Sequence, residues 1–174
     1  MADFRKITTI EPQKKRRDRF SVFLDGEFAF SLHRETLLNS GIATGDELND
    51  RQIQDILNKE NLRMAKEKAL RLLAARPRSA KELKDRLVQA HYSPPVIDSV
   101  LQEFGRLGLI NDSEFAKMYA RSQMVTRPMG SFLLRRELQQ KGLGEEHIQQ
   151  AIDGAYGDQS EEQMAFELAS RRKK

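Results

Sequence analysis

The chain has 174 residues and a net charge of +4, with 39% hydrophobic and 32% charged residues. It contains no cysteine, which excludes disulfides, thiol catalysis and thiolate metal sites. No apolar run approaches the roughly 18 residues of a membrane span, and no apolar segment near the N-terminus resembles a secretory signal, so we expect a soluble cytoplasmic protein.

The first 32 residues have the pattern of β-strands. Two runs flank Asp25-Gly26, a dipeptide typical of the two-residue type I′ turn, and these runs are Phe20–Leu24 and Glu27–Leu32. A third strand is expected over Arg5–Ile10, so the N-terminus predicts a small antiparallel sheet. His33–Ser40 then predicts a short helix that ends at Gly41.

The turn also sets the expected register of the hairpin. A two-residue loop places Phe23 opposite Phe28 and Ser21 opposite Phe30. The other face is then expected to carry Phe20, Val22, Leu24 and Ala29. Because an isolated hairpin is only marginally stable, we expect this sheet to pack on the following helix or to present itself to a partner.

From Asn49 onward the pattern is helical, and it repeats at an offset of 51 residues. Asn49 and Gln52 form a capping box that opens a helical stretch, and a separate helix is expected over about Asn61–Ala75. Nine of the 41 positions from 61 to 101 are identical to their partners 51 residues later, where residue frequencies predict about two or three. Most of these identities fall on apolar or turn positions, which indicates a copied packed unit rather than a compositional bias.

Each copy predicts three helices. In the first copy Ser79 and Glu82 form a capping box for the second helix, Pro94 starts the third, and Gly108 ends it. The second copy has matching residues that start or end its helices, at Asn111, Pro128, Gly142 and Gly154–Gly157. A further helix over Ser160–Arg172 aligns with the start of a third copy, which we expect to be incomplete.

The predicted fold class is therefore mainly α, with tandem three-helix repeats in an elongated array and a small N-terminal antiparallel β-hairpin or sheet. We expect a β extension with a short helix over residues 1–48, and a linker helix with the first repeat over 49–108. The second repeat is expected over 109–157, and a partial third repeat or C-terminal helix over 158–174.

The sequence contains no recognisable catalytic constellation. Gly142-Leu143-Gly144 lacks the strand–turn–helix setting of a phosphate-binding loop, and no serine lies in a nucleophile elbow. Three histidines lack the spacing of metal ligands, namely His33, His91 and His147. We therefore expect no enzyme activity, no cofactor and no metal.

Basic residues concentrate in both copies, with a local balance of +6 over residues 63–91 and +4 over 121–141. Such zones are typical of proteins that bind a polyanion, because phosphate contacts release counterions. The same charges also suit the solvated faces of amphipathic helices. The candidate partner-binding residues are Arg76, Arg78, Lys81, Lys84, Arg121, Arg127, Arg135 and Arg136.

Two other classes of function fit parts of the sequence. Three helices joined by short turns also describe DNA-binding helix-turn-helix modules. Here, however, Lys and Arg are spread along the helices, which favours non-specific phosphate contact over base readout. The other of these two classes is a structural adaptor that uses the hairpin to extend a partner's sheet.

Several segments match the pattern of one known protein family, in the same order along the chain. Near the N-terminus the similar segments are Lys6–Lys15, Phe20–Leu24 and Asp25–Phe30. In the first copy the similar residues are Arg78-Ser79, Glu82-Leu83 and Leu87. In the second copy they are Gly108–Asp112, Phe115-Ala116, Tyr119–Arg121, Gly130, Arg135, Glu137-Leu138 and Lys141–Leu143. With these segments in this order and spacing, the chain resembles the RecX family of bacterial recombinase regulators over nearly its whole length.

This resemblance implies a non-enzymatic protein that binds the RecA recombinase. Family members lodge in the groove of the RecA filament on single-stranded DNA and inhibit its extension, ATP hydrolysis, strand exchange and coprotease activity. The expected partner is therefore the RecA filament, and single- or double-stranded DNA is a second candidate ligand of the basic faces. We expect a monomer. Most members carry three full repeats, whereas the third copy here is expected to be incomplete.

Overall fold

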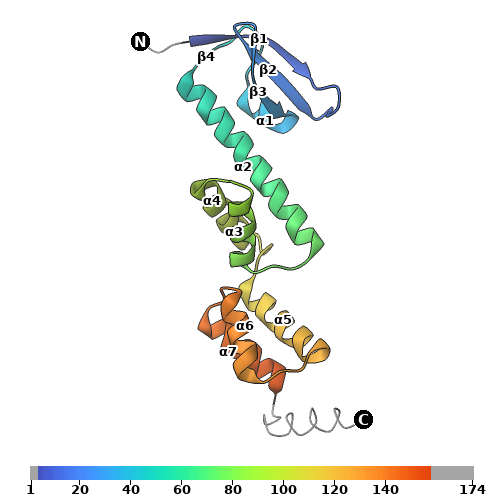
Figure 1. The fold of residues 1–174 in the computed structure, drawn as a ribbon. Helices are drawn as coiled ribbons and strands as arrows, with labels where there is room; N and C mark the ends of the chain where they lie inside the picture. The colour runs from blue at the N-terminus through green and yellow to red at the C-terminus, as the bar shows by residue number, and fades with distance from the viewer. Residues whose placement is uncertain (1–3, 158–174) are drawn as a thin grey trace. The chain divides into compact units, whose positions relative to one another are not determined.

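The computed structural model describes residues 4–157, which contain four strands and seven helices (Figure 1). Residue contacts divide the chain into two compact units with their boundary after Glu67. The N-terminal unit holds the sheet, and the C-terminal unit holds tandem three-helix repeats, so the predicted mainly α class with an N-terminal antiparallel sheet is confirmed. The helix expected over Ser160–Arg172 lies outside the described residues.

The N-terminal sheet is antiparallel and has the spatial order β3-β2-β1-β4. Its strands are β1 (Phe4–Pro12), β2 (Arg19–Leu24), β3 (Glu27–His33) and β4 (Glu47–Asn49). The turn residues Asp25 and Gly26 have φ values of 52° and 88°, which suit a type I′ turn and confirm the hairpin. Phe23 pairs with Phe28, as predicted. β1 is longer than expected at both ends, and β4 is a strand that the sequence does not predict.

The register of the hairpin departs from the expected one at a bulge in β3. Phe30 pairs with Val22 rather than with Ser21, so the predicted pairing is wrong. The extra residue is Ala29, which is exposed instead of lying on the core face. The bulge places Phe30 on the buried face of the sheet next to Val22, and both side chains enter the core.

The core of the N-terminal unit lies between this buried face and α2 (Asp50–Ala75). It consists of Ile7, Val22, Leu24, Phe30, Leu32, Leu48, Ile53 and Ile56. The last two residues are three positions apart on α2, so they share the face that meets the sheet. The expectation that the sheet packs on the following helix is confirmed. The short helix α1 (Arg34–Ser40) ends at Gly41 in the left-handed conformation, also as predicted.

The helix α2 is continuous over 26 residues, whereas the sequence predicts two segments. Its start is as expected, because Asn49 and Gln52 exchange two hydrogen bonds of 2.9 Å between side chain and backbone. Neither Gly nor Pro occurs from Asp50 to Ala75, so nothing in the backbone stops the helix before the separate segment expected from Asn61.

The C-terminal unit contains two three-helix repeats. The end of α2 forms the first repeat with α3 (Ala80–Gln89) and α4 (Pro94–Arg106). The second repeat consists of α5 (Asp112–Thr126), α6 (Ser131–Gln140) and α7 (Glu145–Tyr156). Five of the nine identical pairs of the 51-residue offset are buried to 1% exposure or less in both copies, namely Ala65 and Ala116, Ala69 and Ala120, Leu83 and Leu134, Leu87 and Leu138, and Ile97 and Ile148. The repeat therefore copies a packed core, as the sequence predicts.

Predicted starts and ends of these helices are also present. Ser79 and Glu82 form the capping box that starts α3. Gly108 and Gly142 follow α4 and α6 with φ values of 71° and 77°, a backbone conformation that favours glycine. No helix within residues 4–157 is both long and apolar enough to cross a membrane.

Candidate partner-binding surface

The eight candidate cations are distributed over both repeats of the C-terminal unit. Arg76 and Arg78 lie in the loop between α2 and α3, while Lys81 and Lys84 lie on α3. In the second repeat Arg121 lies on α5, Arg127 directly follows α5, and Arg135 and Arg136 lie on α6. The structure thus places them on three helices and two loops rather than in one cluster.

Three of these cations are neutralised by neighbouring side chains. Arg76 holds Glu82 with both terminal nitrogens, at 3.1 and 3.3 Å from the two carboxylate oxygens. Lys81 pairs with Asp85 at 2.8 Å, one turn further along α3. Arg135 pairs with Glu145 at the start of α7. These side chains contribute less net charge to a partner surface than the sequence indicates.

Four other candidates keep an uncompensated charge. Within residues 4–157, no carboxylate lies within 4.0 Å of their cationic groups, and all four are exposed: Lys84, Arg121, Arg127 and Arg136. Among the eight candidates, these four retain an exposed positive charge without a carboxylate partner in the described chain.

The eighth candidate, Arg78, lies in a different environment. Its guanidinium is partly buried, and its Nε donates to the carbonyl of Leu72 at 3.2 Å. Burial and the positive charge of Arg76 together lower the pKa of Arg78 below its ordinary value, and Arg86 adds to this repulsion. The structure therefore brings Arg76 and Arg78 together with Arg86, a residue that the sequence-based set omits.

The two repeats meet through a polar junction that the sequence-based candidates also miss. The hydroxyl of Ser79, fully buried, donates to the carbonyl of Lys141 at 2.7 Å and accepts from the amide of Glu82 at 3.2 Å. The ammonium of Lys141 in turn donates to Glu82 at 2.9 Å. Asp112, the first residue of α5, accepts from the amide of Ala80 at 2.8 Å. Residues 32 to 62 positions apart thus fix the start of α3 against the second repeat.

The junction holds Glu82 strongly in its ionised form. Burial opposes ionisation, but the hydrogen bonds from Arg76 and Lys141 outweigh it and lower the pKa of Glu82 to about 2. Lys141 also lies 4.6 Å above the ring of Tyr119, whose hydroxyl donates to Glu137 at 2.8 Å. Burial, together with that hydrogen bond, raises the pKa of Tyr119 to about 12.

These values give a prediction for acid stability. Because the folded pKa of Glu82 lies below the ordinary 4.5, its contribution is present above pH 4.5 and is lost as the pH falls towards 2. We expect Glu82→Gln to lose about 2 kcal/mol of unfolding free energy at pH 7 and much less near pH 2. Urea titrations at both pH values measure this difference. The control Asp85→Asn removes an exposed pair and should cost less than about 0.5 kcal/mol; an equal loss in the two variants would contradict the prediction.

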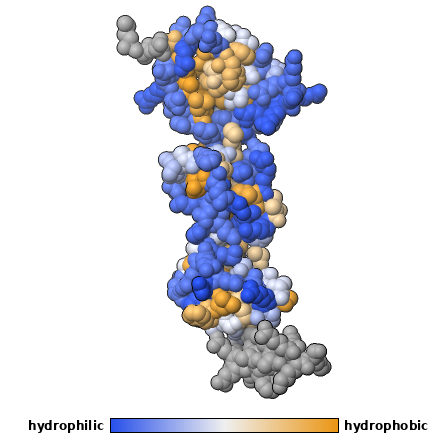
Figure 2. Space-filling view, viewed as in Figure 1, coloured by the Kyte–Doolittle hydropathy of each residue, from blue (hydrophilic) through white to orange (hydrophobic). Residues whose placement is uncertain are grey.

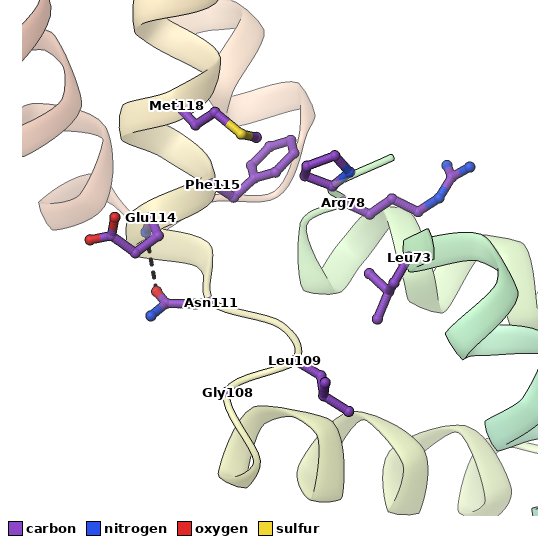
Figure 3. A pocket seen from close by; sticks show the side chains of 9 residues that line it. Leu73, Arg78, Gly108, Leu109, Asn111, Glu114, Phe115 and Met118 are labelled. Atoms are coloured by element: carbon purple, nitrogen blue, oxygen red, sulfur yellow. Dashed lines mark hydrogen bonds between the residues drawn. The ribbon is translucent and has the colours of Figure 1, made fainter. Parts of the chain in front are cut away.

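A groove of about 360 Å³ opens beside the junction (Figure 3). We call it the repeat groove. It is lined by Leu73, Pro77, Arg78, Gly108, Leu109, Asn111, Glu114, Phe115 and Met118, which come from the end of α2, the loop before α3, the loop after α4 and the start of α5. On the face shown in Figure 2, apolar side chains form a broad area on the N-terminal unit and smaller areas on the C-terminal unit, among polar ones. The repeat groove combines apolar walls with two charged side chains, Arg78 and Glu114.

Within the described residues, no group of three or more His, Asp or Glu side chains could bind a metal ion. His33 instead caps α1, because its Nδ1 accepts from the amide of Glu35 at 3.1 Å. The segment Gly142–Gly144 connects α6 to α7 rather than a strand to a helix.

Three protein-family models match the chain in sequence order. The Regulatory protein RecX N-terminal domain matches residues 5–49. The first three-helix domain of RecX matches residues 65–104, and the second matches residues 111–152.

Similar proteins carry the same name. The chain is 34% identical over 166 residues to the Regulatory protein RecX of Listeria welshimeri, covering 95% of this chain and 61% of that protein. It is 36% identical over 157 residues to the Regulatory protein RecX of Bacillus subtilis, covering 90% of this chain and 60% of that protein. The chain thus spans about three fifths of the length of these relatives.

Two solved structures that are similar to this chain are also of RecX proteins. A crystal structure of regulatory protein RecX matches with a TM-score of 0.77 and 28% identity, covering 96% of this chain and 81% of that one. A crystal structure of RecX from Lactobacillus salivarius matches with a TM-score of 0.60 and 25% identity, covering 65% of this chain and 73% of that one.

Proposed function

Because this chain belongs to the RecX family, we propose that it is a negative regulator of the RecA recombinase. It binds in the groove of the RecA filament on single-stranded DNA and acts by occupancy rather than by catalysis. Occupancy of the groove inhibits filament extension, ATP hydrolysis, strand exchange and coprotease activity, and so restrains recombination and the SOS response. The protein acts as a monomer in the cytoplasm, where RecA works.

The observation that carries this proposal is the ordered match of three RecX domain models across residues 5–152. The structure adds a physical reason. Each repeat presents exposed cations without carboxylate partners in the described chain, such as Lys84 in the first and Arg136 in the second. Cations spaced over two packed repeats suit a partner that is itself a repeating polyanion or acidic surface. The chain spans about three fifths of the length of these relatives, so the degree to which it inhibits RecA is proposed rather than taken from them.

The test is RecA ATPase activity on single-stranded DNA at near-physiological salt, with this protein added at substoichiometric amounts. We expect the ATPase rate to fall well below that of RecA alone, because one bound regulator affects a growing filament beyond a single RecA subunit. An unchanged rate, even at stoichiometric amounts, would overturn the proposal.

The alternative is a non-specific DNA-binding repeat protein that acts without RecA. The same exposed cations favour it, and salt dependence distinguishes it from the main proposal. Phosphate binding by these cations would give a DNA affinity that falls steeply with salt. Tight, salt-sensitive DNA binding without any effect on RecA would support this alternative.

A charge-reversal pair tests which cations meet the partner. We expect the double variant Lys84→Glu and Arg136→Glu to weaken filament binding by about tenfold or more, because neither side chain has a carboxylate partner in the described chain. The control reverses the exposed Arg51 and Lys59 of α2 in the N-terminal unit and changes the net charge by the same amount. Binding is measured by co-sedimentation with RecA filaments. Equal weakening in both double variants would show that only net charge matters.

A further inference from the structure

We propose that the repeat groove docks a peptide segment of the RecA filament that carries an apolar side chain beside a carboxylate. The apolar side chain enters between Leu73, Leu109 and Met118, and the carboxylate meets Arg78. This inference rests on the proposed function, because it takes the filament protein as the partner.

The walls of the groove are apolar and open to solvent. Leu109 is 45% exposed and Met118 is 43% exposed, although both are large hydrophobic residues. Leu73 and the rings of Pro77 and Phe115 complete this lining (Figure 3). A volume of about 360 Å³ admits one or two large apolar side chains. Burying Leu109 and Met118 against such a side chain removes apolar surface from water, which favours association.

One end of the groove carries an uncompensated positive charge. Arg78 uses its Nε for the carbonyl of Leu72, and no carboxylate in residues 4–157 lies within 4.0 Å of its guanidinium. Glu82 is the acidic residue that acts on Arg78, but its carboxylate is already held by Arg76 and Lys141. The terminal nitrogens of Arg78 are therefore suited to receive a carboxylate from a partner.

The acidic residue that lines the groove does not cancel this charge. Glu114 lies on the first turn of α5, and its carboxylate pairs with Lys117 at 3.1 Å. The groove therefore combines an acid that is already paired, a guanidinium without a carboxylate partner in the described chain, and an apolar floor. Charge complementarity favours a partner segment whose carboxylate is adjacent to its apolar side chain.

The lining favours a peptide over a nucleic acid. Single-stranded nucleic acids bind on exposed aromatic rings that stack with bases. The aromatic residue of the groove is Phe115, which is only 6% exposed. Aliphatic and thioether side chains from Leu109 and Met118 form the accessible walls instead, and such surfaces suit apolar protein side chains.

The test places a negative charge in the groove without changing the fold. Met118 and Val125 both lie on α5, and both are exposed, at 43% and 83%. Met118→Glu places a carboxylate where the partner's apolar side chain would lie, whereas Val125→Glu makes the same chemical change outside the groove. We expect Met118→Glu to weaken binding to RecA filaments on single-stranded DNA by about tenfold or more, and Val125→Glu by less than about twofold. Circular dichroism and urea unfolding confirm that both variants are folded.

A second variant addresses the charge. Arg78→Gln keeps the polar side chain but removes the guanidinium, and it should also weaken filament binding by about fivefold or more. If Met118→Glu and Arg78→Gln inhibit RecA like the unmodified protein, the groove proposal is overturned while the proposed function stands. If the unmodified protein does not bind the filament, both proposals fail. If Met118→Glu loses affinity for single-stranded DNA alone to the same extent, the groove binds nucleic acid and the peptide proposal is overturned.

Discussion

Replacement of Glu60 by glutamine should lower the free energy of unfolding of the N-terminal unit by about 3 kcal/mol at pH 7. Glu60 is only 3% exposed, and its carboxylate accepts from Arg19 at 3.0 Å and from the amide of His33 at 3.2 Å. Arg63 lies 3.5 Å from the same carboxylate. A neutral amide leaves the partly buried guanidinium of Arg19 without its counter-charge and leaves Arg63 with the exposed Glu67 as its acidic partner, and this accounts for the size of the effect.

The loss in this variant should depend on pH. Burial opposes ionisation, but hydrogen bonds from Thr36 and His33 and the charge of Arg63 together lower the pKa of Glu60 below 4.5. The stabilisation is therefore present above pH 4.5 and is lost on further acidification, so the difference between the variant and the unmodified protein should shrink at pH 3. Hydrogen exchange of the β2 and β3 amides gives a readout local to this unit.

The control for this prediction is Glu67→Gln on the same helix. Glu67 pairs with Arg63 at 3.1 Å, but its side chain is 51% exposed, so its loss should cost less than about 0.5 kcal/mol. If Glu60→Gln matches this control, the buried ion network does not contribute to stability as the structure indicates.

Most elements of the fold could be predicted from the sequence because their signals are local. Asp25-Gly26 determines the hairpin turn, and Ser79 with Glu82 determines the start of α3. The bulge at Ala29 could not be predicted in this way, because it depends on which face Phe30 buries once α2 covers the sheet. β4 also escaped prediction, since its three residues form a strand only by pairing with β1.

The sequence predicted which cations the candidate surface contains, but not which of them form ion pairs. The local sequence identifies the cations, yet the neutralisation of Arg135 depends on how the loop after α6 brings Glu145 to it. The junction escaped prediction for a similar reason. Ser79 and Glu82 have a clear local role as a capping box, which hides their second role across 62 and 59 residues with Lys141. The same holds for the repeat groove, whose walls Leu73 and Met118 are 45 positions apart.

Both the junction and the repeat groove depend on how closely the two repeats approach each other, and Gly142 tests this. We expect Gly142→Ala to destabilise the C-terminal unit by about 3 kcal/mol, and Gly108→Ala by about 1 kcal/mol. Both glycines have positive φ values, of 77° and 71°, so alanine is strained at either position. At Gly142 an added Cβ would also lie 2.4 Å from Cδ and 2.6 Å from Cβ of Lys81. The Cβ of Lys81 is fixed to α3, so the clash cannot be relieved by the flexible end of the side chain alone.

Gly108 is a matched control, because an alanine Cβ there has no neighbour within 4 Å. The difference between the two variants in urea unfolding therefore isolates the contact between repeats from the cost of the backbone conformation. Relief of the clash moves the loop after α6 away from α3, which also stretches the bond from Ser79 to the carbonyl of Lys141. We therefore expect Gly142→Ala, unlike Gly108→Ala, to raise the exchange rate of the α3 amides. Equal destabilisation by the two variants would mean that the repeats do not approach each other this closely in solution.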